Sequence, residues 1–231
     1  MKNRIAVIFS SHLDDVANQK FTNHVLETIG IKNVSVTCYH NYNQFSLAEI
    51  YNKGITESSD DNTIMVFCHN DIIFRTKNWG KMLLTKFNSS DFSIIGVAGT
   101  TYLAENGVWW TDRSKMCGVV EHTDGQRVWV NEYATPKAGY TKPVVLVDGL
   151  FIAADCNKTI HGWDEEFKGY HMYDISFCFP NVLDGCNIGV TSDIRILHKS
   201  VGITNDQWEA NRKQFIEKYK DELPFSIDEY L

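Results

Sequence analysis

The sequence lacks the features that mark membrane, secreted and zinc-binding proteins. No apolar run approaches the roughly 18 residues that a membrane-spanning helix needs, so we expect no transmembrane segment. The first residues enter a strand-like pattern directly, without the apolar core of a signal peptide. The six cysteines form no Cys-x-x-Cys pair and no zinc-type spacing, and Cys38 and Cys68 lie inside apolar runs. We therefore expect reduced thiols in a cytoplasmic protein.

The chain has no excess of basic residues either. Its 22 Lys and Arg face 29 Asp and Glu, giving a net charge of −7, which argues against a broad nucleic-acid surface. A local basic spot for one phosphate stays compatible with this composition. The sequence contains no Gly-x-Gly-x-x-Gly and no Walker-type lysine loop, the two common phosphate-binding fingerprints. Its 231 residues, of which 43% are hydrophobic, predict one ordinary globular domain.

What the sequence does contain is organised around residues 63–74. Six mostly apolar residues, 63–68, have the length and composition of a strand that is buried on both faces. His69, Asn70 and Asp71 follow at its carboxyl end, where ligands bind in open α/β sheets. A buried Asp needs a partner, and a divalent cation is one such partner. The alternative is a strand-end turn in which Asn70 and Asp71 only bond the local backbone.

Strand and helix patterns alternate through the first hundred residues. Apolar runs predict strands over 5–9, 34–38, 63–68 and 92–98, and helical periodicity predicts helices over 14–29, 47–54 and 79–87. Ser46 and Glu49 have the spacing of a capping box for the second helix, and Gly30 is a plausible C-cap of the first. This alternation favours a parallel sheet with right-handed crossovers, a Rossmann-like arrangement.

The pattern is less regular after residue 100. Residues 100–142 form a long insertion of the kind that often binds substrate, and Asp124-Gly125 predicts a hairpin turn within it. An apolar run over 144–153 is interrupted by Asp148-Gly149, which indicates a bulge or the close approach of a ligand. The remaining predicted elements are a helix from His171 or Asp174 to about Leu183, a closing pair of strands at 188–190 and 194–197, and a last amphipathic helix carrying Trp208 to Tyr219.

Three segments that are distant in the sequence offer metal-binding side chains. His69 and Asp71 follow the central strand, Asp174 lies at a helix start, and His198 follows a late strand. Such a set suits Mn²⁺ or Mg²⁺ with positions left for phosphate oxygens, and manganese accepts imidazole more readily than magnesium does. A single histidine is more often an ordinary core or surface residue, and for His198 that interpretation stays open.

Five short stretches occur in an order typical of one enzyme group. They are Ser46–Ile55, Ile64–Ile72, Val147–Phe151, Trp163–Asp174 and Leu197–Gly202. In this succession they resemble bacterial GT-A glycosyltransferases, in particular a family-2-like group that carries His-x-Asp in place of the usual Asp-x-Asp. The resemblance covers about residues 5–203. It implies an α/β, GT-A-like (Rossmann-like) single domain with a mixed, mostly parallel central sheet flanked by helices.

The resemblance also implies a reaction and a set of site residues. The expected reaction is the metal-dependent transfer of a sugar from a nucleoside diphosphate sugar to an acceptor hydroxyl, with inversion. Carried over by position, His69, Asp71 and His198 would hold Mn²⁺ or Mg²⁺, and Asp174 matches the general base. Asp148 and Gly149 match the segment at the donor sugar and acceptor, and the residues at the nucleotide would be Ser10, Ser11, Asn52, Gly54 and Asn70.

Two positions depart from the group's pattern. His69 replaces the first acid of the usual motif, which bears on metal affinity. Ser176 follows Asp174 where related sequences often show a second acid, so Asp164 or Glu165 is an alternative base. The chemistry needs both kinds of group, because a cation neutralises the leaving diphosphate and a carboxylate takes the hydroxyl proton.

We therefore predict one glycosyltransferase-like domain over 1–231. It would comprise a nucleotide-binding half at 1–100, an acceptor and catalytic half at 101–203, and a C-terminal helix and tail at 204–231. Its expected partners are a nucleotide sugar and a saccharide or other hydroxyl acceptor; Trp109, Trp110 and Trp163 either stack on sugar faces or belong to the core. Three other functions fit these residues: a non-catalytic nucleotide- or carbohydrate-binding member of the fold, a metal phosphohydrolase, and an interaction domain without a metal.

Overall fold

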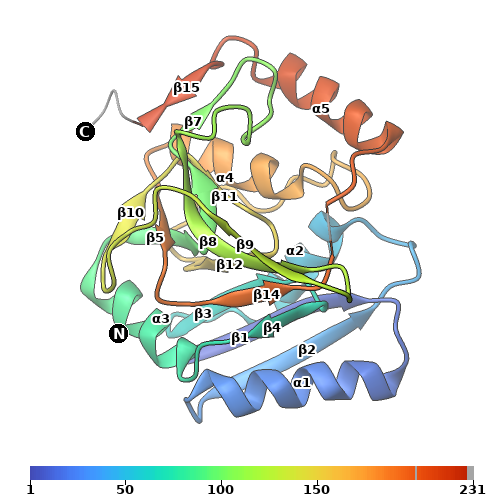
Figure 1. Ribbon diagram of the computed structural model, residues 1–231, viewed down its shortest axis with the longest axis vertical. Coiled ribbons are helices and arrows are strands. Elements are labelled where there is room, and N and C mark those ends of the chain that lie inside the picture. The colour runs from blue at the N-terminus through green and yellow to red at the C-terminus, as the bar shows by residue number, and fades with distance from the viewer. Residues whose placement is uncertain (201, 228–231) are drawn as a thin grey trace.

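A seven-stranded sheet runs through the centre of the computed structural model (Figure 1), in the order β10-β13-β5-β12-β3-β1-β2. The structure describes residues 1–200 and 202–227; Val201 of the late motif and residues 228–231 of the predicted tail lie outside the described residues. The strands of this sheet are β1 (Arg4–Ser11), β2 (Val34–His40), β3 (Thr63–Cys68), β5 (Phe92–Gly96), β10 (Thr141–Pro143), β12 (Phe151–Ala154) and β13 (Asn187–Thr191).

The sheet is mixed, as predicted, and five of its seven strands run in the same direction, whereas β10 and β12 run in the opposite one. β1 pairs in parallel with β2 and β3, and β13 pairs in parallel with β5. From the alternation of strands and helices along the sequence alone, β5 would lie beside β3. In the structure the antiparallel strand β12 lies between them. All four residues of β12 are buried, because it has a strand on each side and a core layer on each face. The predicted second half of the chain therefore contributes a strand to the middle of the first.

Two hydrophobic layers cover the two faces of the sheet. Ile5, Val7 and Phe9 pack with α1 (Asp15–Ile29) and α3 (Trp79–Ser89). Ala6 and Ile8 belong to the other layer, which contains α2 (Leu47–Ser58) and α4 (Tyr173–Leu183). Alternate residues of one strand thus face opposite layers, as the period of two requires. α5 (Asp206–Lys218) lies beyond α4, at the end of the molecule opposite α1 (Figure 1).

Local signals in the sequence set the ends of these helices. The Ser46 backbone N–H donates to Glu49 Oε2 at 2.7 Å, and the Glu49 N–H donates to Ser46 Oγ at 3.3 Å, which confirms the capping box. Gly30 ends α1 with φ of 74°, a left-handed conformation that glycine adopts without a steric cost. No described helix has the length and apolarity needed to cross a membrane.

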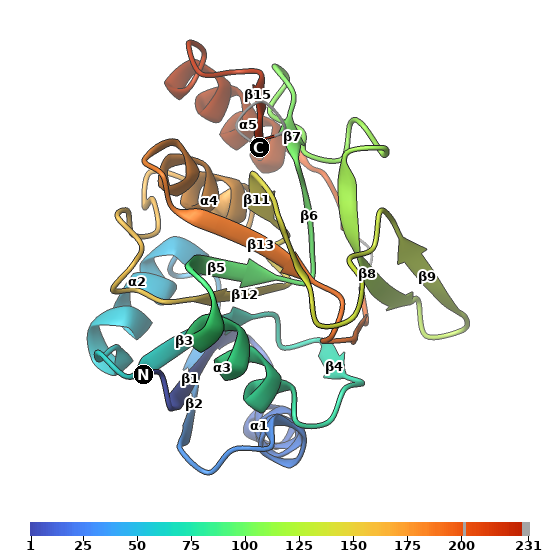
Figure 2. The same ribbon diagram turned by 90° about the vertical axis from the view of Figure 1, so that its left-hand side faces the viewer.

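A second sheet stands beside the first (Figure 2), in the order β11-β6-β8-β14-β4. Its strands are β4 (Ile72–Phe74), β6 (Ala98–Thr100), β8 (Met116–Thr123), β11 (Leu146–Val147) and β14 (Ile196–His198), and β9 (Val128–Glu132) pairs with β8. Thr123 pairs with Val128, so the hairpin predicted at Asp124-Gly125 is confirmed. The short strands β7 (Tyr102–Leu103) and β15 (Phe225–Ser226) form a two-stranded sheet.

The prediction that the two late strands pair with each other is wrong. Both strands exist, but β13 pairs with β10 and β5 in the central sheet, whereas β14 pairs with β4 and β8 in the second sheet. The physical reason is that β4 leaves the central sheet after the polar triplet at 69–71 and presents a new edge. β14 adds to that edge antiparallel, which sets His198 opposite Ile72.

Substitution of Gly80 tests the packing of α3 on α1. Alanine has a better helix propensity by about 1 kcal/mol. However, a Cβ at position 80 would clash with Ile29 Cγ1 and lie 2.9 Å from the Ile29 carbonyl oxygen. We expect Gly80→Ala to lower the free energy of unfolding by about 1–3 kcal/mol in urea titrations, because overpacking outweighs propensity. The neighbouring exposed Lys81→Ala is the control, and a stabilised Gly80→Ala variant would contradict this packing.

Candidate active site

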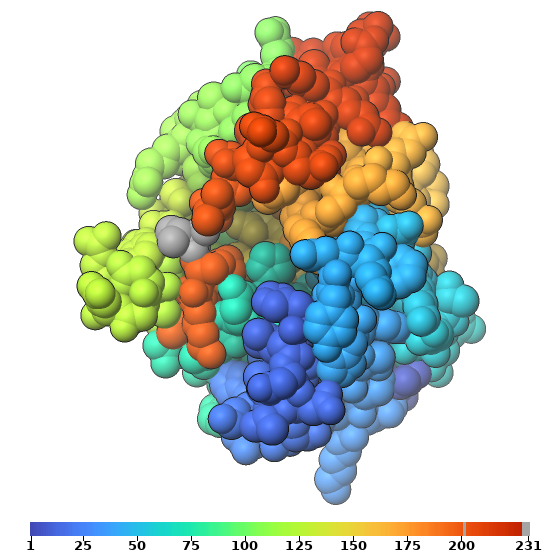
Figure 3. All heavy atoms as spheres, turned by 90° about the vertical axis from the view of Figure 1, so that its right-hand side faces the viewer, coloured from blue at the N-terminus to red at the C-terminus, as the bar shows by residue number. Residues whose placement is uncertain are grey.

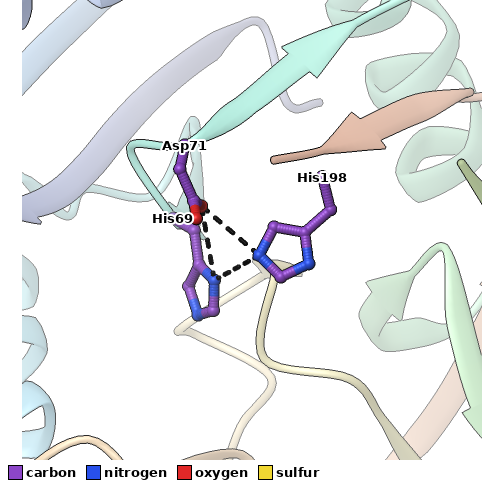
Figure 4. Close-up of side chains that lie close together, drawn as sticks. All are labelled: His69, Asp71 and His198. Atoms are coloured by element: carbon purple, nitrogen blue, oxygen red, sulfur yellow. Dashed lines mark hydrogen bonds and ion pairs between the residues drawn. The ribbon is translucent and has the colours of Figure 1, made fainter. Parts of the chain in front are cut away.

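Three predicted metal ligands meet where the two sheets join (Figure 4). His69 and Asp71 lie in the turn between β3 and β4, and His198 ends β14. His69 Nδ1 lies 3.3 Å from His198 Nε2 and 3.8 Å from Asp71 Oδ1. His198 Nε2 lies 3.3 Å from the same carboxylate oxygen. All three ligand atoms therefore face one point, although 129 residues separate the two histidines.

The charges of this cluster are strongly coupled. Burial by itself raises the pKa of Asp71, but contact with His198 and the charge of His69 lower it to about 2. Burial by itself lowers the pKa of His198, but contact with the Asp71 carboxylate raises it above the usual value. Burial and the charge of His198 lower the pKa of His69. The cluster thus holds an ionised carboxylate between imidazoles that cannot both be charged at low cost.

A divalent cation fits this set of side chains. Asp71 Oδ1 is buried and accepts no hydrogen bond from the described residues, despite the imidazole nitrogens near it. Buried polar atoms normally have a partner, so this oxygen has unused capacity. Two imidazole nitrogens and a carboxylate oxygen on one triangular face leave other coordination positions open, and this donor type suits Mn²⁺.

Two residues that the sequence analysis did not select contact the histidines. The Tyr173 hydroxyl lies 2.8 Å from His69 Nε2, and the Ser200 hydroxyl lies 2.9 Å from His198 Nε2. Tyr173 is the first residue of α4 and only 5% exposed. Both residues stand in the motifs quoted above, beside Asp174 and His198. No periodicity distinguishes them there: the contact of Tyr173 with His69 spans 104 residues, whereas Ser200 lies only two residues after His198.

A cavity of about 350 Å³ opens at the carboxyl ends of β1, β2 and β3, and we call it the strand-end cavity. Its lining includes Ser10, Ser11, Asn41, Asn70 and Asp71. The Asn70 amide donates to Ser11 Oγ at 2.8 Å, which joins the ends of β1 and β3. Parallel strands therefore bring three of the residues predicted at the nucleotide to one cavity wall.

Asn52 and Gly54, the other two residues predicted at the nucleotide, do not line either cavity beside the cluster. The Asn52 amide donates to the Trp163 carbonyl and to Glu165 Oε1, both at 2.8 Å. A Cβ at Gly54 would lie 3.0 Å from Ile8 Cγ2, so this glycine lets α2 pack closely on β1. Gly54 thus serves packing between helix and sheet, whereas Asn52 joins α2 to the segment at residues 163–165.

A cavity of about 690 Å³ lies on the other side of the cluster, and we call it the larger cavity. Asp148, Gly149 and Asp174 line it, and it shares His69 and Ser200 with the strand-end cavity. Figure 3 shows this side of the molecule, which is hollowed between the yellow-green β8–β9 hairpin, the red α5 and the blue amino-terminal segments. The cluster thus lies at the junction of two cavities.

The two acids of the larger cavity interact. The Gly149 backbone N–H donates to Asp174 Oδ2 at 3.1 Å. Burial and then the nearby charge of Asp148 raise the pKa of Asp174 to about 7. A carboxyl group with a pKa near neutrality is suited to accept and release a proton at physiological pH.

Asp164 and Glu165, the alternative candidates for the base, do not line the larger cavity. Asp164 and Glu166 both bind the Lys218 ammonium, at 2.7 and 2.8 Å, and Asp164 lines a separate cavity of about 460 Å³. Glu165 accepts from Asn52. Of the three tryptophans considered, Trp163 and Trp109 are buried, whereas Trp110 is 42% exposed and lines the larger cavity.

The raised pKa of Asp174 predicts a pH-dependent difference in stability. An unfolded Asp titrates near 3.8 and the folded one near 7, so stability is full below about pH 4 and falls as the pH rises through 7. An asparagine side chain at this position does not titrate. For the metal-free chain, we expect the unfolding free energy of Asp174→Asn relative to wild type to rise by about 1–2 kcal/mol between pH 5 and pH 8.5, the side chain being half-buried. The exposed Asp61→Asn is the control, and an equal difference at both pH values would contradict the shift.

Comparisons with known proteins agree with this architecture. Residues 21–219 match a glycosyltransferase-like family. We found no curated protein whose sequence matches the chain. The solved structure of GalNAc-T7 with UDP, GalNAc and Mn²⁺ is similar, with a TM-score of 0.60 and 12% identity; the match covers 95% of this chain and 49% of that one. This chain thus spans about half the length of that structure.

Two further structures share the fold. The mannosyltransferase PcManGT from Pyrobaculum calidifontis, in complex with GDP-Man and Mn²⁺, gives a TM-score of 0.54 at 10% identity and covers 93% of this chain and 62% of its own. The catalytic domain of Drosophila β1,4-galactosyltransferase 7, in complex with xylobiose, gives a TM-score of 0.51 at 13% identity. That match covers 91% of this chain and 79% of the other. At such identities the likeness concerns the fold alone. The family match extends over most of the sequence, and the chain therefore belongs to the glycosyltransferase-like family and has a GT-A-type α/β fold.

Proposed function

We propose that this protein is a metal-dependent glycosyltransferase, which moves a sugar from a nucleoside diphosphate sugar to an acceptor hydroxyl. The observation that carries the proposal is the triangle of His69 Nδ1, Asp71 Oδ1 and His198 Nε2 at the junction of two cavities. This arrangement suits a transferase, because two substrates must be held together beside the cation and the base.

The triangle would hold Mn²⁺ in preference to Mg²⁺. Magnesium favours oxygen ligands and retains its water, whereas two of the three atoms here are imidazole nitrogens. When bound, the cation supplies positive charge to the leaving diphosphate. His198 must be neutral to bind a metal, so metal binding displaces the proton that Asp71 stabilises on it.

The strand-end cavity is the proposed nucleotide site. Ser10, Ser11 and Asn70 present hydroxyl and amide groups there, next to Asp71. The similar structures of GalNAc-T7 and PcManGT contain UDP with Mn²⁺ and GDP-Man with Mn²⁺, respectively, which supports a nucleoside diphosphate as ligand. The lining carries no Lys or Arg among the described residues, so the diphosphate charge would depend on the cation.

Asp174 is the proposed general base. It lines the larger cavity beside Asp148, where an acceptor hydroxyl would enter, and its pKa near 7 lets it take up a proton as the hydroxyl attacks. A base on the acceptor side of the cluster is consistent with an inverting transfer. Asp164 and Glu165 are less suitable, because Lys218 and Asn52 occupy their carboxylates.

Tyr173 is the proposed positioning residue for His69. For Nδ1 to offer its lone pair to a metal, Nε2 must carry the proton, and the Tyr173 hydroxyl accepts it at 2.8 Å. Gly149 makes this contact possible, because a Cβ at that position would overlap the Tyr173 hydroxyl. The Gly149 N–H also binds Asp174, so one glycine links the metal ligands to the proposed base.

Metal binding is the first test of the proposal. We expect calorimetric titration to give one Mn²⁺ per chain, with Mg²⁺ binding more weakly. Asp71→Asn and His198→Ala should each lower Mn²⁺ affinity by at least about 100-fold, since each removes a ligand. His161→Ala is the control, because His161 pairs with Asp184 beside a different cavity. Equal Mn²⁺ affinity in all four proteins would exclude this metal site.

Turnover then separates the remaining functions. UDP and GDP should each be tested for a Mn²⁺-dependent rise in melting temperature, because a ligand of the native state stabilises it. Slow release of UDP or GDP from a sugar donor is expected of a transferase without its acceptor. Nucleotide binding with no turnover of any donor would favour a binding protein, and hydrolysis of simple phosphate esters without a nucleoside would favour a phosphohydrolase.

Tyr173→Phe tests the positioning role. The phenyl ring fills the same space, so the fold should persist, but His69 Nε2 loses its partner. We expect Mn²⁺ affinity to fall about 10–100-fold, measured by electron paramagnetic resonance of free Mn²⁺. Tyr51→Phe is the control, because it removes the hydroxyl of a neighbouring buried tyrosine. A Tyr173→Phe variant that binds Mn²⁺ like Tyr51→Phe would refute the role.

A further inference from the structure

Three tryptophans form an aromatic wall of the larger cavity. Trp109, Trp110 and Trp208 all line it. The Trp110 ring centroid lies 5.6 Å from that of Trp109, at 84°, and 5.8 Å from that of Trp208, at 36°. Trp109 is 7% exposed and Trp110 is 42% exposed, so a buried indole supports one whose ring is open to the cavity. Such a surface packs against the flat, C–H-bearing face of a ring.

The wall is held in place before any ligand binds. Arg212 of α5 donates to the Asn106 carbonyl at 2.7 Å, which ties the helix to the loop before Trp109. Its guanidinium also lies 5.7 Å from the Trp208 ring centroid and makes two hydrogen bonds of 2.7 Å to Glu209. The position of the indoles is thus fixed by contacts within the protein, and the Arg212 charge is already paired.

The cavity is lined by two acids and by imidazoles. Burial lowers the pKa values of His69, His122 and His171, and His198 is a proposed metal ligand. The acids are Asp148 and Asp174, and none of the cavity's described lining residues is Lys or Arg. A phosphate or carboxylate on the acceptor would find no Lys or Arg as a partner there, and the Asp148 carboxylate would repel it. Neutral polar groups are available at the rim, where Ser200, Thr204 and Asn205 contribute hydroxyl and amide groups.

From these observations we infer that the acceptor is an uncharged saccharide, one ring of which packs on Trp110 while its hydroxyls face Asp148 and Asp174. This inference rests on the proposed function, because it names the molecule that enters the acceptor side of that site. It excludes acceptors whose reacting end carries a phosphate or a uronic acid. The cation does not alter this conclusion, since the donor diphosphate already faces it.

Matched pairs of small glycosides test the inference. Methyl β-D-glucoside and methyl β-D-galactoside would be compared with the methyl glycosides of glucuronic and galacturonic acid, which carry a free carboxylate in place of the CH₂OH group. Xylobiose would be included as a neutral disaccharide. Binding would be measured by saturation-transfer NMR and tryptophan fluorescence with UDP or GDP and Mn²⁺ present. We expect neutral saccharides to bind at least about tenfold more tightly than their uronides, because like charges are unfavourable in a cavity.

Variants locate the bound ring. Trp110→Ala should weaken binding of the neutral saccharides about tenfold, the size of one lost aromatic contact, while nucleotide and Mn²⁺ affinities stay unchanged. Tyr140→Ala, which removes another exposed aromatic side chain outside the cavity, should have no effect. Uronides that bind as well as their neutral partners, an unaffected Trp110→Ala variant, or no binding by any neutral saccharide would each overturn the inference. If the wild-type protein binds neither a nucleotide nor Mn²⁺, that result would instead overturn the proposed function.

Discussion

The antiparallel pairing of β4 with β14 is the constraint on which the site depends. It sets Ile72 opposite His198 and so brings a residue from the end of the chain beside the turn that follows β3. β3 itself is buried along its whole length, with β1 and β12 as neighbours, so the turn cannot shift without disturbing the middle of the sheet. A short strand pair on a rigid support therefore fixes the distances among His69, Asp71 and His198.

Without a bound cation, the arrangement of His69, Asp71 and His198 is unfavourable in free energy, and this points to a functional site. Asp71 stays ionised, its buried Oδ1 accepts no hydrogen bond from the described residues, and two imidazoles share the space beside it. Structures tolerate such local conflicts mainly at functional sites. Tyr173 and Gly149 extend the arrangement toward Asp174, so the proposed metal ligands, the proposed positioning hydroxyl and the proposed base form one connected group. We interpret this connection as the means by which the donor and acceptor sides keep their relative geometry.

Local chemistry could be predicted from the sequence, and long-range pairing could not. The capping box at Ser46, the left-handed Gly30 and the turn at Asp124-Gly125 depend on a few adjacent residues, and each was predicted correctly. The insertion of β12 and the partner of β14 depend on edges that other segments create, so no window of sequence contains them. The contacts of Asn52 with residues 163–165 and of Gly54 with Ile8 are likewise set by the fold and cannot be seen in a window of sequence. Tyr173 was missed since its contact to His69 spans 104 residues.

The central claim is that His69, Asp71 and His198 bind one cation together. Anomalous diffraction at the manganese absorption edge, from crystals grown with Mn²⁺ and UDP or GDP, tests it most directly. The account predicts a single strong peak about 2.0–2.3 Å from His69 Nδ1, Asp71 Oδ1 and His198 Nε2, with nucleotide density in the strand-end cavity. Nucleotide density in that cavity with no peak among the three side chains, or a peak held by other residues, would contradict it.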